Sequence, residues 1–420
     1  MSERTPGRHR EARERLAWDP MITIDEHLED ILRTAHRLPA VQRSLTEAHG
    51  LVLAADVISR LPSPLFDNSA MDGYAVRRTD ATAGAVLRIV ADVAAGSDED
   101  PVIGPGEAAR IMTGAAVPST ADAIVPLEHT DLGTAIRAQA PDQITVLVEP
   151  EPGAHIRGRG EDASAGALAV ASGTPMGPWQ LSAVASAGVE EVAVHRPPRV
   201  AIISTGSELI APSGTPRRGQ IPESNSVLLN AAARDAGAVI TSIRIVPDDP
   251  AVLRQALDST DADVVILSGG ASVGAFDVVK AVLGGERGVR FDQVAMQPGR
   301  PQGFGVLDTG TIVFCLPGNP VSVAASFEMF VRPALRQMAG FAVIDRPRVV
   351  RAAGVAWASP KGRVQLVPAV FDDEIVRPAT GGGSRSHLVT SLAAATAFAI
   401  IPAETERVHE RDPVTVMVLS

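Results

Sequence analysis

The sequence predicts a multidomain protein that combines a doubly wound, parallel-sheet α/β domain with separate β regions. From Arg199 onward, short apolar runs alternate with glycine loops and helical stretches, and this rhythm is typical of an α/β sheet. Residues 75–149, and again the residues after Gly340, consist of short apolar runs separated by Gly, Pro and Asp, which indicates small β domains. The 420 residues are enough for about three domains.

The chain begins its folded part with a predicted helix over residues 24–37. Thr23 and Glu26 have the spacing of a capping box, and apolar residues follow at helical intervals. We expect a second short helix that ends near Gly50. The segment LPSPLFDNSAMDGYAV then interrupts regular structure with its prolines and its Asp-Gly pair.

The first β region has four candidate strands, in VLRIVADV, AARIMTG, DAIVPLE and ITVLVE. A charged glycine-rich loop, HIRGRGEDASAG, follows it, and a helix is expected from Pro178 to Gly188. The pair Pro197-Pro198 is the clearest linker in the chain.

Beyond that linker, strands and helices alternate. RVAIIS, VITSIRIV, ADVVILS and TIVFCLP are predicted strands, and helices are expected over residues 225–236, 250–257 and 321–338. Asp249 is a suitable N-cap for the second of these helices because Pro250 follows it. After Gly340, the segments QLVPAV, EIVRP, AFAII and VTVMVL are candidate strands.

Four polar loops follow the carboxyl ends of strands in the predicted sheet. They are residues 204–208, 248–249, 268–274 and 316–320. Parallel strands end at one edge of a sheet, so we expect the four loops to form one ligand site there. The loop after Leu267 is rich in glycine, which lets backbone N–H groups approach an anion closely.

Composition excludes several classes of protein. A net charge of −11 leaves no excess of cations for binding a nucleic-acid backbone. The single cysteine, Cys315, rules out an intrachain disulfide and fits a reducing compartment, so we expect a cytoplasmic location. The arginine-rich first 16 residues lack the apolar stretch of a signal peptide and are interpreted as a disordered tail. The longest apolar run, 392–401, is shorter than the roughly 20 residues needed to span a bilayer.

Several familiar catalytic signatures fit poorly. GASVG matches the nucleophile elbow of α/β hydrolases, with Ser272 as nucleophile, but its partner would be His387 in the separate β region. Neither dinucleotide-binding nor Walker-type glycine motifs follow a strand, and the histidines lack zinc-site spacing. The remaining candidates are acids: Glu208, Asp248 and Asp277 lie on the converging loops and suit Mg²⁺ held together with substrate phosphates.

A series of motifs also resembles a known family. DNSAMDGYAV, RIMTGAAVP, ADAIVPLE, GRGED, STGSEL, LSGGASVG with FDVVK, PGRP and LPGNPVS occur in an order similar to that of the molybdopterin molybdenumtransferases. These enzymes insert molybdenum during synthesis of the molybdenum cofactor. The resemblance extends from about Pro20 to the C-terminus.

The resemblance implies an elongated homodimer of four-domain subunits, with an active site shared between subunits. Adenylated molybdopterin and molybdate would be the substrates, Mg²⁺ the cofactor and AMP a product; no nucleic acid or membrane is involved. Contacts with the adenylyltransferase or with acceptor molybdoenzymes are compatible with it. The implied division is a tail (1–19), a discontinuous helical linker domain (20–60 with 152–196), a small β domain (61–151), a molybdopterin-binding α/β domain (197–342) and a β-barrel-like domain (343–420).

The resemblance also implies site residues. The catalytic set is Asp72, Thr113, Asp162, Glu208, Asp248 and Asp277. Asp248 and Asp277 are the expected metal ligands. The expected substrate-binding residues are Ser204, Thr205, Gly206, Ser268, Gly269, Gly270, Ser272, Gly274, Pro298, Arg300, Pro317, Gly318, Asn319, Pro320 and Ser322.

This chain departs from the family pattern in two places. Many relatives have a KPGKP-like segment, whereas this chain has Gln297 in place of the first lysine and Arg300 in place of the second. The ESN segment at 223–225 often begins with Asp in relatives. Two alternatives stay open, namely an adenylyltransferase-type step on molybdopterin and a non-catalytic scaffold of the same fold.

Overall fold

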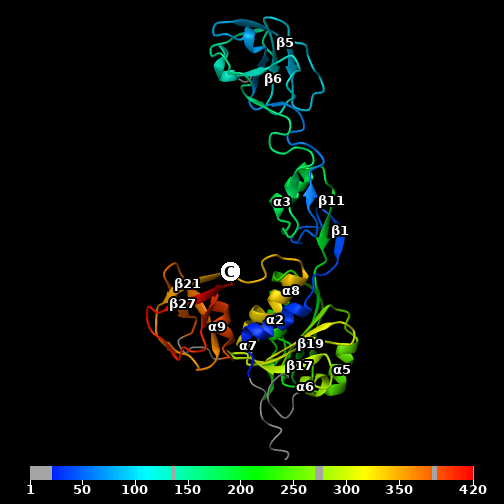
Figure 1. Cartoon of the computed structure of the whole chain (residues 1–420), viewed down its shortest axis with the longest axis vertical. Coiled ribbons are helices and arrows are strands. Elements are labelled where there is room, and N and C mark those ends of the chain that lie inside the picture. Colours follow the sequence, from blue (N-terminus) through cyan, green and yellow to red (C-terminus); the bar gives the residue numbers. More distant parts are fainter. Residues whose placement is uncertain (1–20, 135–137, 270–277, 381–385, 420) are drawn as a thin grey trace, which may run out of the picture. The chain divides into compact units, whose positions relative to one another are not determined.

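The computed structural model describes residues 21–134, 138–269, 278–380 and 386–419, so the expected tail lies outside the described residues. Within these ranges the chain divides into two compact units (Figure 1). The larger unit contains the residues up to Val41, Gly50–Ala54 and all residues from Val194 onward. The smaller unit contains Gln42–His49 and Ala55–Ala193. The finer domain boundaries given above stay a prediction.

The larger unit is built on a six-stranded sheet with the order β15-β12-β16-β20-β19-β17. Its strands are β12 (Arg199–Thr205), β15 (Val239–Val246), β16 (Val264–Ser268), β17 (Val289–Gln293), β19 (Pro301–Val306) and β20 (Ile312–Leu316). The first four in the order are parallel, which confirms the expected α/β sheet. β19 and β17 are antiparallel additions, because short connections without a crossover helix join β17, β19 and β20.

Helices cover both faces of this sheet. They are α2 (Ile24–Thr34), α4 (Asn225–Asp235), α5 (Pro250–Asp258), α6 (Val278–Leu283), α7 (Pro320–Ser326), a π-helical segment η3 (Phe327–Val331) and α8 (Arg332–Met338). Successive residues of β12 alternate between two apolar clusters: Val200 and Ile202 pack in one, Ala201 and Ile203 in the other. The fold is therefore doubly wound, since strands buried on both faces need no polar positions. Cys315 is buried in the second cluster.

Local signals correctly located most helices, with one error. The capping box at Thr23 is present, and Asp249 accepts hydrogen bonds from the first N–H groups of α5. The second short helix was wrong: Ala40–Ser44 forms strand β1, which pairs with β11 (Glu191–His195). A pairing with residues this distant leaves no mark in the local sequence pattern.

The C-terminal part of the larger unit is a closed barrel. Its strands are β21 (Arg348–Ala353), β23 (Val364–Phe371), β24 (Ile375–Pro378), β25 (Ala397–Ile401) and β27 (Pro413–Val418). β23 pairs with both β24 and β25, so the ring closes and leaves no open edge. The shorter elements here are β18 (Met296–Gln297), which adds to β23, the pair β22 (Trp357–Ala358) and β26 (Arg407–Val408), and α9 (Val389–Ala394). The expected barrel-like region is confirmed.

The smaller unit contains the expected small β sheet, ordered β7-β4-β6-β5-β8. Its strands are β4 (Gly73–Val76), β5 (Val86–Val93), β6 (Glu107–Ile111), β7 (Ala123–Pro126) and β8 (Gln143–Thr145). The remaining elements are β2 (Val57–Ile58) with β10 (Leu168–Val170), β3 (Asn68–Ser69) with β9 (Ile156–Arg157), η1 (Arg78–Asp80), η2 (Leu127–His129) and α3 (Pro178–Ser186). In the part of the chain that the structure describes, no helix has the length and apolarity needed to cross a membrane.

An ion pair at the amino edge of the sheet gives the first testable prediction. Arg196 donates two hydrogen bonds to Asp263, at 2.7 and 2.9 Å, and the Arg199 N–H donates a third at 2.8 Å. Burial raises the pKa of Asp263, but these hydrogen bonds outweigh burial and hold the pKa below its ordinary value. We expect Asp263→Asn to cost about 1–3 kcal/mol of unfolding free energy of the larger unit at pH 7.

The sign of the pH dependence follows from the lowered pKa. The stabilisation is present above the ordinary carboxyl pKa and is lost as the pH falls through the lower folded-state value. Denaturant titrations near pH 7 and near pH 3 measure both regimes. Asp261→Asn is the matched control, because Asp261 pairs with Arg199 at the exposed surface and should contribute little. Equal losses of unfolding free energy in Asp263→Asn and Asp261→Asn at pH 7 would contradict this account.

Candidate functional site

A cavity of about 810 Å³ lies at the carboxyl edge of the parallel strands. Its wall includes residues of all four loops singled out in the sequence. The predicted site residues in the wall are Thr205, Gly206, Glu208, Asp248, Ser268, Gly269, Pro317, Gly318, Asn319, Pro320 and Ser322. Gly270, Ser272, Gly274 and Asp277 lie outside the described residues. The proposed elbow at Ser272 therefore falls there too, whereas His387 is part of the cavity wall.

Two glycines bring separate loops into backbone contact at the floor of the cavity. Gly269 has φ +95°, and a Cβ atom placed there would lie 2.4 Å from the Thr205 carbonyl oxygen. A Cβ atom on Gly318 would lie 3.4 Å from the Gly269 Cα. Glycine at position 269 therefore permits both the positive φ and the close approach.

A buried carboxylate ties three segments together beneath the cavity wall. Glu223 is 2% exposed, and one of its carboxylate oxygens accepts hydrogen bonds from Ser204 Oγ at 2.9 Å and from the Ser226 N–H at 2.8 Å. Its second oxygen accepts one from Ser226 Oγ. Ser204 Oγ also lies 3.0 Å from Ser268 Oγ. Ser204, predicted as a substrate contact, thus belongs to this network and is absent from the described cavity wall.

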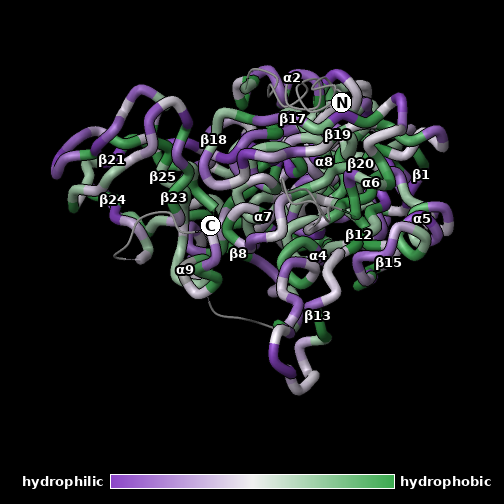
Figure 2. Tube along the Cα trace, turned by 90° about the horizontal axis from the view of Figure 1, so that it is seen from below, coloured by the Kyte–Doolittle hydropathy of each residue, from purple (hydrophilic) through white to green (hydrophobic). Residues whose placement is uncertain are grey.

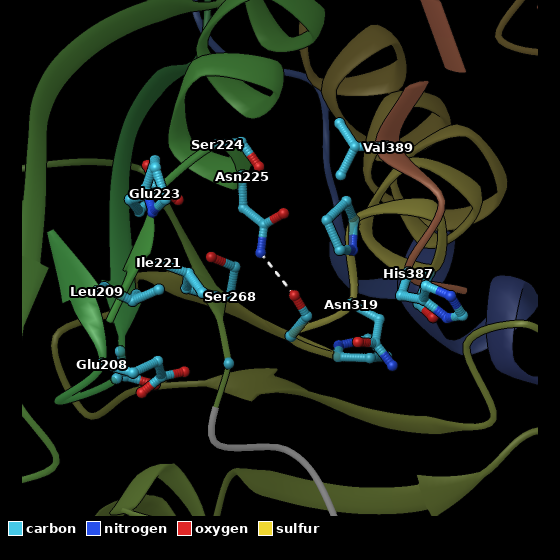
Figure 3. A pocket seen from close by; sticks show the side chains of 18 of the residues that line it. Glu208, Leu209, Ile221, Glu223, Ser224, Asn225, Ser268, Asn319, His387 and Val389 are labelled. Atoms are coloured by element: carbon cyan, nitrogen blue, oxygen red, sulfur yellow. Dashed lines mark hydrogen bonds between the residues drawn. The ribbon is translucent and has the colours of Figure 1, made fainter. Parts of the chain in front are cut away.

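Two wall residues, Thr205 and Asn225, each contain a buried polar atom without a partner in the described chain. Asn225 donates from Nδ2 to the Gly318 carbonyl oxygen at 2.8 Å (Figure 3). Its Oδ1 and the Thr205 Oγ1 are buried and have no hydrogen-bond partner within the described chain. A buried polar atom without a partner is costly, so the wall is not fully satisfied by the described chain at these two positions.

Asp248 and Glu208, the other two acids in the wall, differ in how they are held. Asp248 Oδ2 accepts a hydrogen bond from the Ser207 N–H at 3.0 Å, and Ser207 Oγ accepts one from the Asp248 N–H at 3.1 Å. Glu208 folds back over its own turn, since its Oε2 lies 2.7 Å from the position of a Cβ on Gly206. Among the described residues, no group of three or more His, Cys, Asp or Glu side chains is arranged to hold a metal ion.

The segment that replaces the family's lysine motif borders the cavity through its backbone. Gly299 and Pro301 are wall residues, whereas Pro298 is buried and Arg300 is exposed outside the described wall. Gln302 anchors this segment by donating to the Gly299 carbonyl oxygen at 2.5 Å and to Ser326 Oγ at 2.7 Å.

The C-terminal region adds a wall segment that the sequence did not predict. His387 and Val389 line the cavity, and Figure 3 places His387 beside Asn319. The preceding Ser386 accepts a hydrogen bond from the Val321 N–H at 3.1 Å and one from Asn319 Nδ2 at 3.0 Å. These bonds attach the barrel region to the N-terminus of α7.

The other three predicted catalytic residues lie in the smaller unit. Asp72 precedes β4 and Thr113 follows β6, two strands that pair antiparallel. Asp72 Oδ1 accepts hydrogen bonds from the Thr113 N–H at 2.7 Å and from Thr113 Oγ1 at 2.8 Å. The backbone hydrogen bond, and then the hydroxyl bond, lower the pKa of Asp72 below its ordinary value. Asp162 is exposed, and its own N–H donates to the Ser63 carbonyl oxygen at 2.9 Å.

Removal of the Thr113 hydroxyl should raise the pKa of Asp72 part of the way to its ordinary value. In Thr113→Val the backbone N–H bond stays while the hydroxyl bond is lost, so the rise is partial. A carbon-detected NMR titration of the Asp72 carboxyl group measures it. Thr145→Val, on another strand of the same sheet, should leave the Asp72 pKa unchanged. A pKa unaffected by Thr113→Val would show that the hydroxyl bond is not formed in solution.

Ten wall residues are absent from the predicted site set. They are Leu209, Ile221, Pro222, Glu223, Ser224, Asn225, Gly299, Pro301, His387 and Val389. Leu209 lies in the STGSEL motif, and Gly299 and Pro301 lie in PGRP, so these motifs were an available signal. The ESN segment precedes a predicted helix, which was a second signal. No local signal marks His387, since a long-range contact brings it to the wall.

Comparison with known proteins covers almost the whole chain. Residues 22–188 match the family described as MoeA N-terminal region (domain I and II), residues 201–337 a probable molybdopterin binding domain, and residues 351–419 the MoeA C-terminal region (domain IV). Among solved structures, a molybdopterin biosynthesis MoeA protein from Pyrococcus horikoshii is similar, with a TM-score of 0.78 and 29% identity over 95% of this chain and 99% of that chain.

Named relatives are similar along their full length. Molybdopterin molybdenumtransferase 2 of Mycobacterium tuberculosis is 41% identical over 92% of this chain and 97% of its own length. Molybdopterin molybdenumtransferase 1 of the same organism is 34% identical over 95% and 99%. The resemblance inferred from the motifs is thereby confirmed, and the chain belongs to the MoeA family of molybdopterin molybdenumtransferases, enzymes of molybdenum cofactor biosynthesis.

Proposed function

We propose that this protein inserts molybdenum from molybdate into adenylated molybdopterin, with Mg²⁺ as cofactor and AMP as a product. The observation that carries the proposal is the convergence of the four strand-end loops on one cavity of about 810 Å³. A cavity of this size can enclose much of a substrate made of a pterin and a nucleotide. The relatives' names indicate the reaction class, and we propose the cavity as the place where the reaction occurs.

Two kinds of group in this chain would act on the substrate: groups that bind its anionic parts and groups that orient it. Backbone N–H groups of the loop that begins at Ser268 would hold a phosphate of the substrate, because glycines let that backbone approach closely. Thr205 and Asn225, which line the cavity, would orient polar groups of the substrate. Ser322, with the 316–320 loop and Arg300, would receive molybdate as the second substrate.

The donor set of the described site fits Mg²⁺. Mg²⁺ usually binds through one or two carboxylates, substrate phosphates and water, so a preformed cluster of three acids is not required. Asp248 is held by the Ser207 N–H at 3.0 Å and would be one ligand. Asp277, outside the described residues, is the proposed second. When bound, the metal would supply Lewis-acid polarisation of a phosphoryl oxygen.

We further propose that the site is completed in a homodimer. Asp72, Thr113 and Asp162 would act on the substrate bound by the partner subunit's cavity residues. The Thr113 bonds keep Asp72 ionised and oriented, as needed for a carboxylate that contacts a metal, a water or a substrate hydroxyl. Cytoplasmic location and contacts with the adenylyltransferase or acceptor enzymes stay predictions.

The experiment that tests the function is a reconstituted reaction. Purified protein is mixed with adenylated molybdopterin, Mg²⁺ and molybdate, and AMP release and molybdenum content of the pterin are measured. We expect both products, and no ATP consumption. ATP-dependent adenylation of molybdopterin without molybdate would favour the adenylyltransferase alternative, and neither activity would favour a scaffold. AMP release by Asp277→Ala at the wild-type rate would reject the metal assignment.

Gln297, at a position where many relatives have a lysine, gives a further prediction. Gln297→Lys should lower the dissociation constant for molybdate, because it adds a positive charge to the segment that borders the cavity at Gly299. Titration with molybdate at fixed ionic strength measures the change. Arg363→Lys, a charge-neutral exchange in the barrel region, is the control. An unchanged or larger dissociation constant for Gln297→Lys would reject this role.

A further inference from the structure

A loop of ten residues, 211–220, leaves the cavity wall and returns to it. It connects β13 (Leu209–Ile210) to β14 (Ile221–Pro222), and we call it the arginine loop because it contains Arg217 and Arg218. Leu209 and Ile221 are themselves wall residues. Figure 2 shows the segment that follows β13 standing out from the rest of the larger unit, with hydrophilic residues along it. The loop is therefore attached to the site at both ends.

The base of the arginine loop is fixed to the residues that form the cavity. Leu209 pairs with Ile221 in the short β13–β14 ladder. The Ile221 N–H donates to the Glu208 carbonyl oxygen at 2.9 Å, and the Glu223 N–H donates to the Ile210 carbonyl oxygen at the same distance. Both stems therefore continue directly into wall acids, Glu208 before β13 and Glu223 after β14.

The two arginines sit on a defined turn. The Gln220 N–H donates to the Arg217 carbonyl oxygen at 3.0 Å, and the Arg217 N–H donates to Gln220 Oε1 at 3.1 Å. Gly219, in the third position of this turn, has φ +88°, as a type II turn requires. Arg218 thus occupies the second, outermost position. Both side chains are exposed, and no ion pair joins either one to a carboxylate in the described chain.

The charge of the cavity wall explains why such a loop would be useful. Its charged residues are Glu208, Glu223 and Asp248, and the described wall contains neither lysine nor arginine. A substrate with phosphate groups would be repelled by this wall unless cations accompany it. Mg²⁺ would offset the carboxylates, but the phosphates of the substrate carry further negative charge. Guanidinium groups match phosphate oxygens in two-pronged geometry.

We propose that Arg217 and Arg218 bind the phosphate groups of the adenylated pterin and help to draw it into the cavity. This inference rests on the proposed function. It assigns a substrate-binding role to a segment that lies outside the recognised motifs. The bound class of ligand is a phosphate ester or diphosphate, held at the mouth of the cavity by two guanidinium groups on one turn.

The test compares steady-state AMP release by wild-type protein and by Arg217→Gln/Arg218→Gln. We expect KM for the adenylated substrate to rise about tenfold with kcat nearly unchanged, because the lost contacts act on binding. The rise should shrink at high salt, which screens exposed charges. Arg217→Lys/Arg218→Lys keeps the positive charge but loses the planar pair of N–H donors of the guanidinium group. Its KM should therefore lie between those of the wild-type protein and the glutamine variant.

Arg234→Gln/Arg287→Gln is the matched control, since it removes the same charge from exposed positions outside the described cavity wall. A KM for the arginine-loop variant equal to that of the control would overturn the proposal. Separate calorimetric titrations with AMP and with molybdopterin show which phosphate the loop holds: weakened binding of either one supports it, and unchanged binding of both rejects it. Absence of AMP release by the wild-type protein would instead reject the proposed function itself.

Discussion

A mixture of Asp72→Asn and Asp248→Asn subunits is expected to recover about a quarter of wild-type activity, although each variant alone is nearly inactive. Each single change should lower the rate on the order of a hundredfold, as loss of a ligand or its support commonly does. The recovery would follow from the proposed site shared between the subunits of a symmetric dimer. Half of the dimers in the mixture contain one subunit of each kind, and one of their two sites then carries neither change.

Asn has nearly the same shape as Asp, so both substitutions should remove the charge without disrupting the fold. Asn at position 72 retains an oxygen that can accept the Thr113 N–H bond, so the fold of the smaller unit should survive. Asn at position 248 likewise retains an acceptor for the Ser207 N–H. Subunits are mixed under conditions of exchange, exchange is verified by native mass spectrometry, and AMP release is measured.

Two variants that both carry their change in the smaller unit provide the control. Asp72→Asn mixed with Asp162→Asn should recover nothing, because both residues lie in the smaller unit and every site would contain one change or the other. Recovery only from the Asp72 and Asp248 combination supports the shared site. If the exchanged mixture shows no more than the average activity of its two components, the site is formed without a partner subunit.

Gly269→Ala should destabilise the larger unit by about 3 kcal/mol and abolish most of the activity. A positive φ costs a non-glycine residue roughly 1–2 kcal/mol. In addition, the new Cβ would meet the Thr205 carbonyl oxygen at 2.4 Å, a backbone atom that moves only if β12 shifts. Such a shift would displace Thr205 and Gly206 in the cavity wall. Denaturant unfolding of the larger unit and AMP release measure the two effects.

Gly285→Ala is the matched control in the same unit. A Cβ atom there has no neighbour within 4 Å, so its effect on the unfolding free energy should stay within about 0.5 kcal/mol. Equal stability of the two variants would mean that the loop after β16 relaxes freely around Thr205. A destabilised but fully active Gly269→Ala protein would show that this backbone contact serves stability alone.

The sequence by itself determined the elements whose signals are local. Three apolar runs, in RVAIIS, VVILS and IVFCL, predicted strands buried on both faces, and Val200 and Ala201 indeed pack in opposite clusters. The capping box at Thr23 and the cap at Asp249 located helix starts, because their hydrogen bonds span only a few residues. The positions of the strand-end loops also predict one ligand edge, and eleven residues of the predicted site lie in the cavity wall.

The tertiary structure decided whatever depends on residues far apart in the chain. Residues 40–44, expected to be part of a helix, form strand β1 because they pair with β11. Ser204, expected to contact the substrate, instead donates a hydrogen bond to the buried Glu223. The tertiary structure also brought His387 to the wall through the bonds of Ser386 to the N-terminus of α7. Such contacts form between segments whose separation in sequence carries no periodic signal. The residue types present at the site could therefore be predicted, whereas their partners could not.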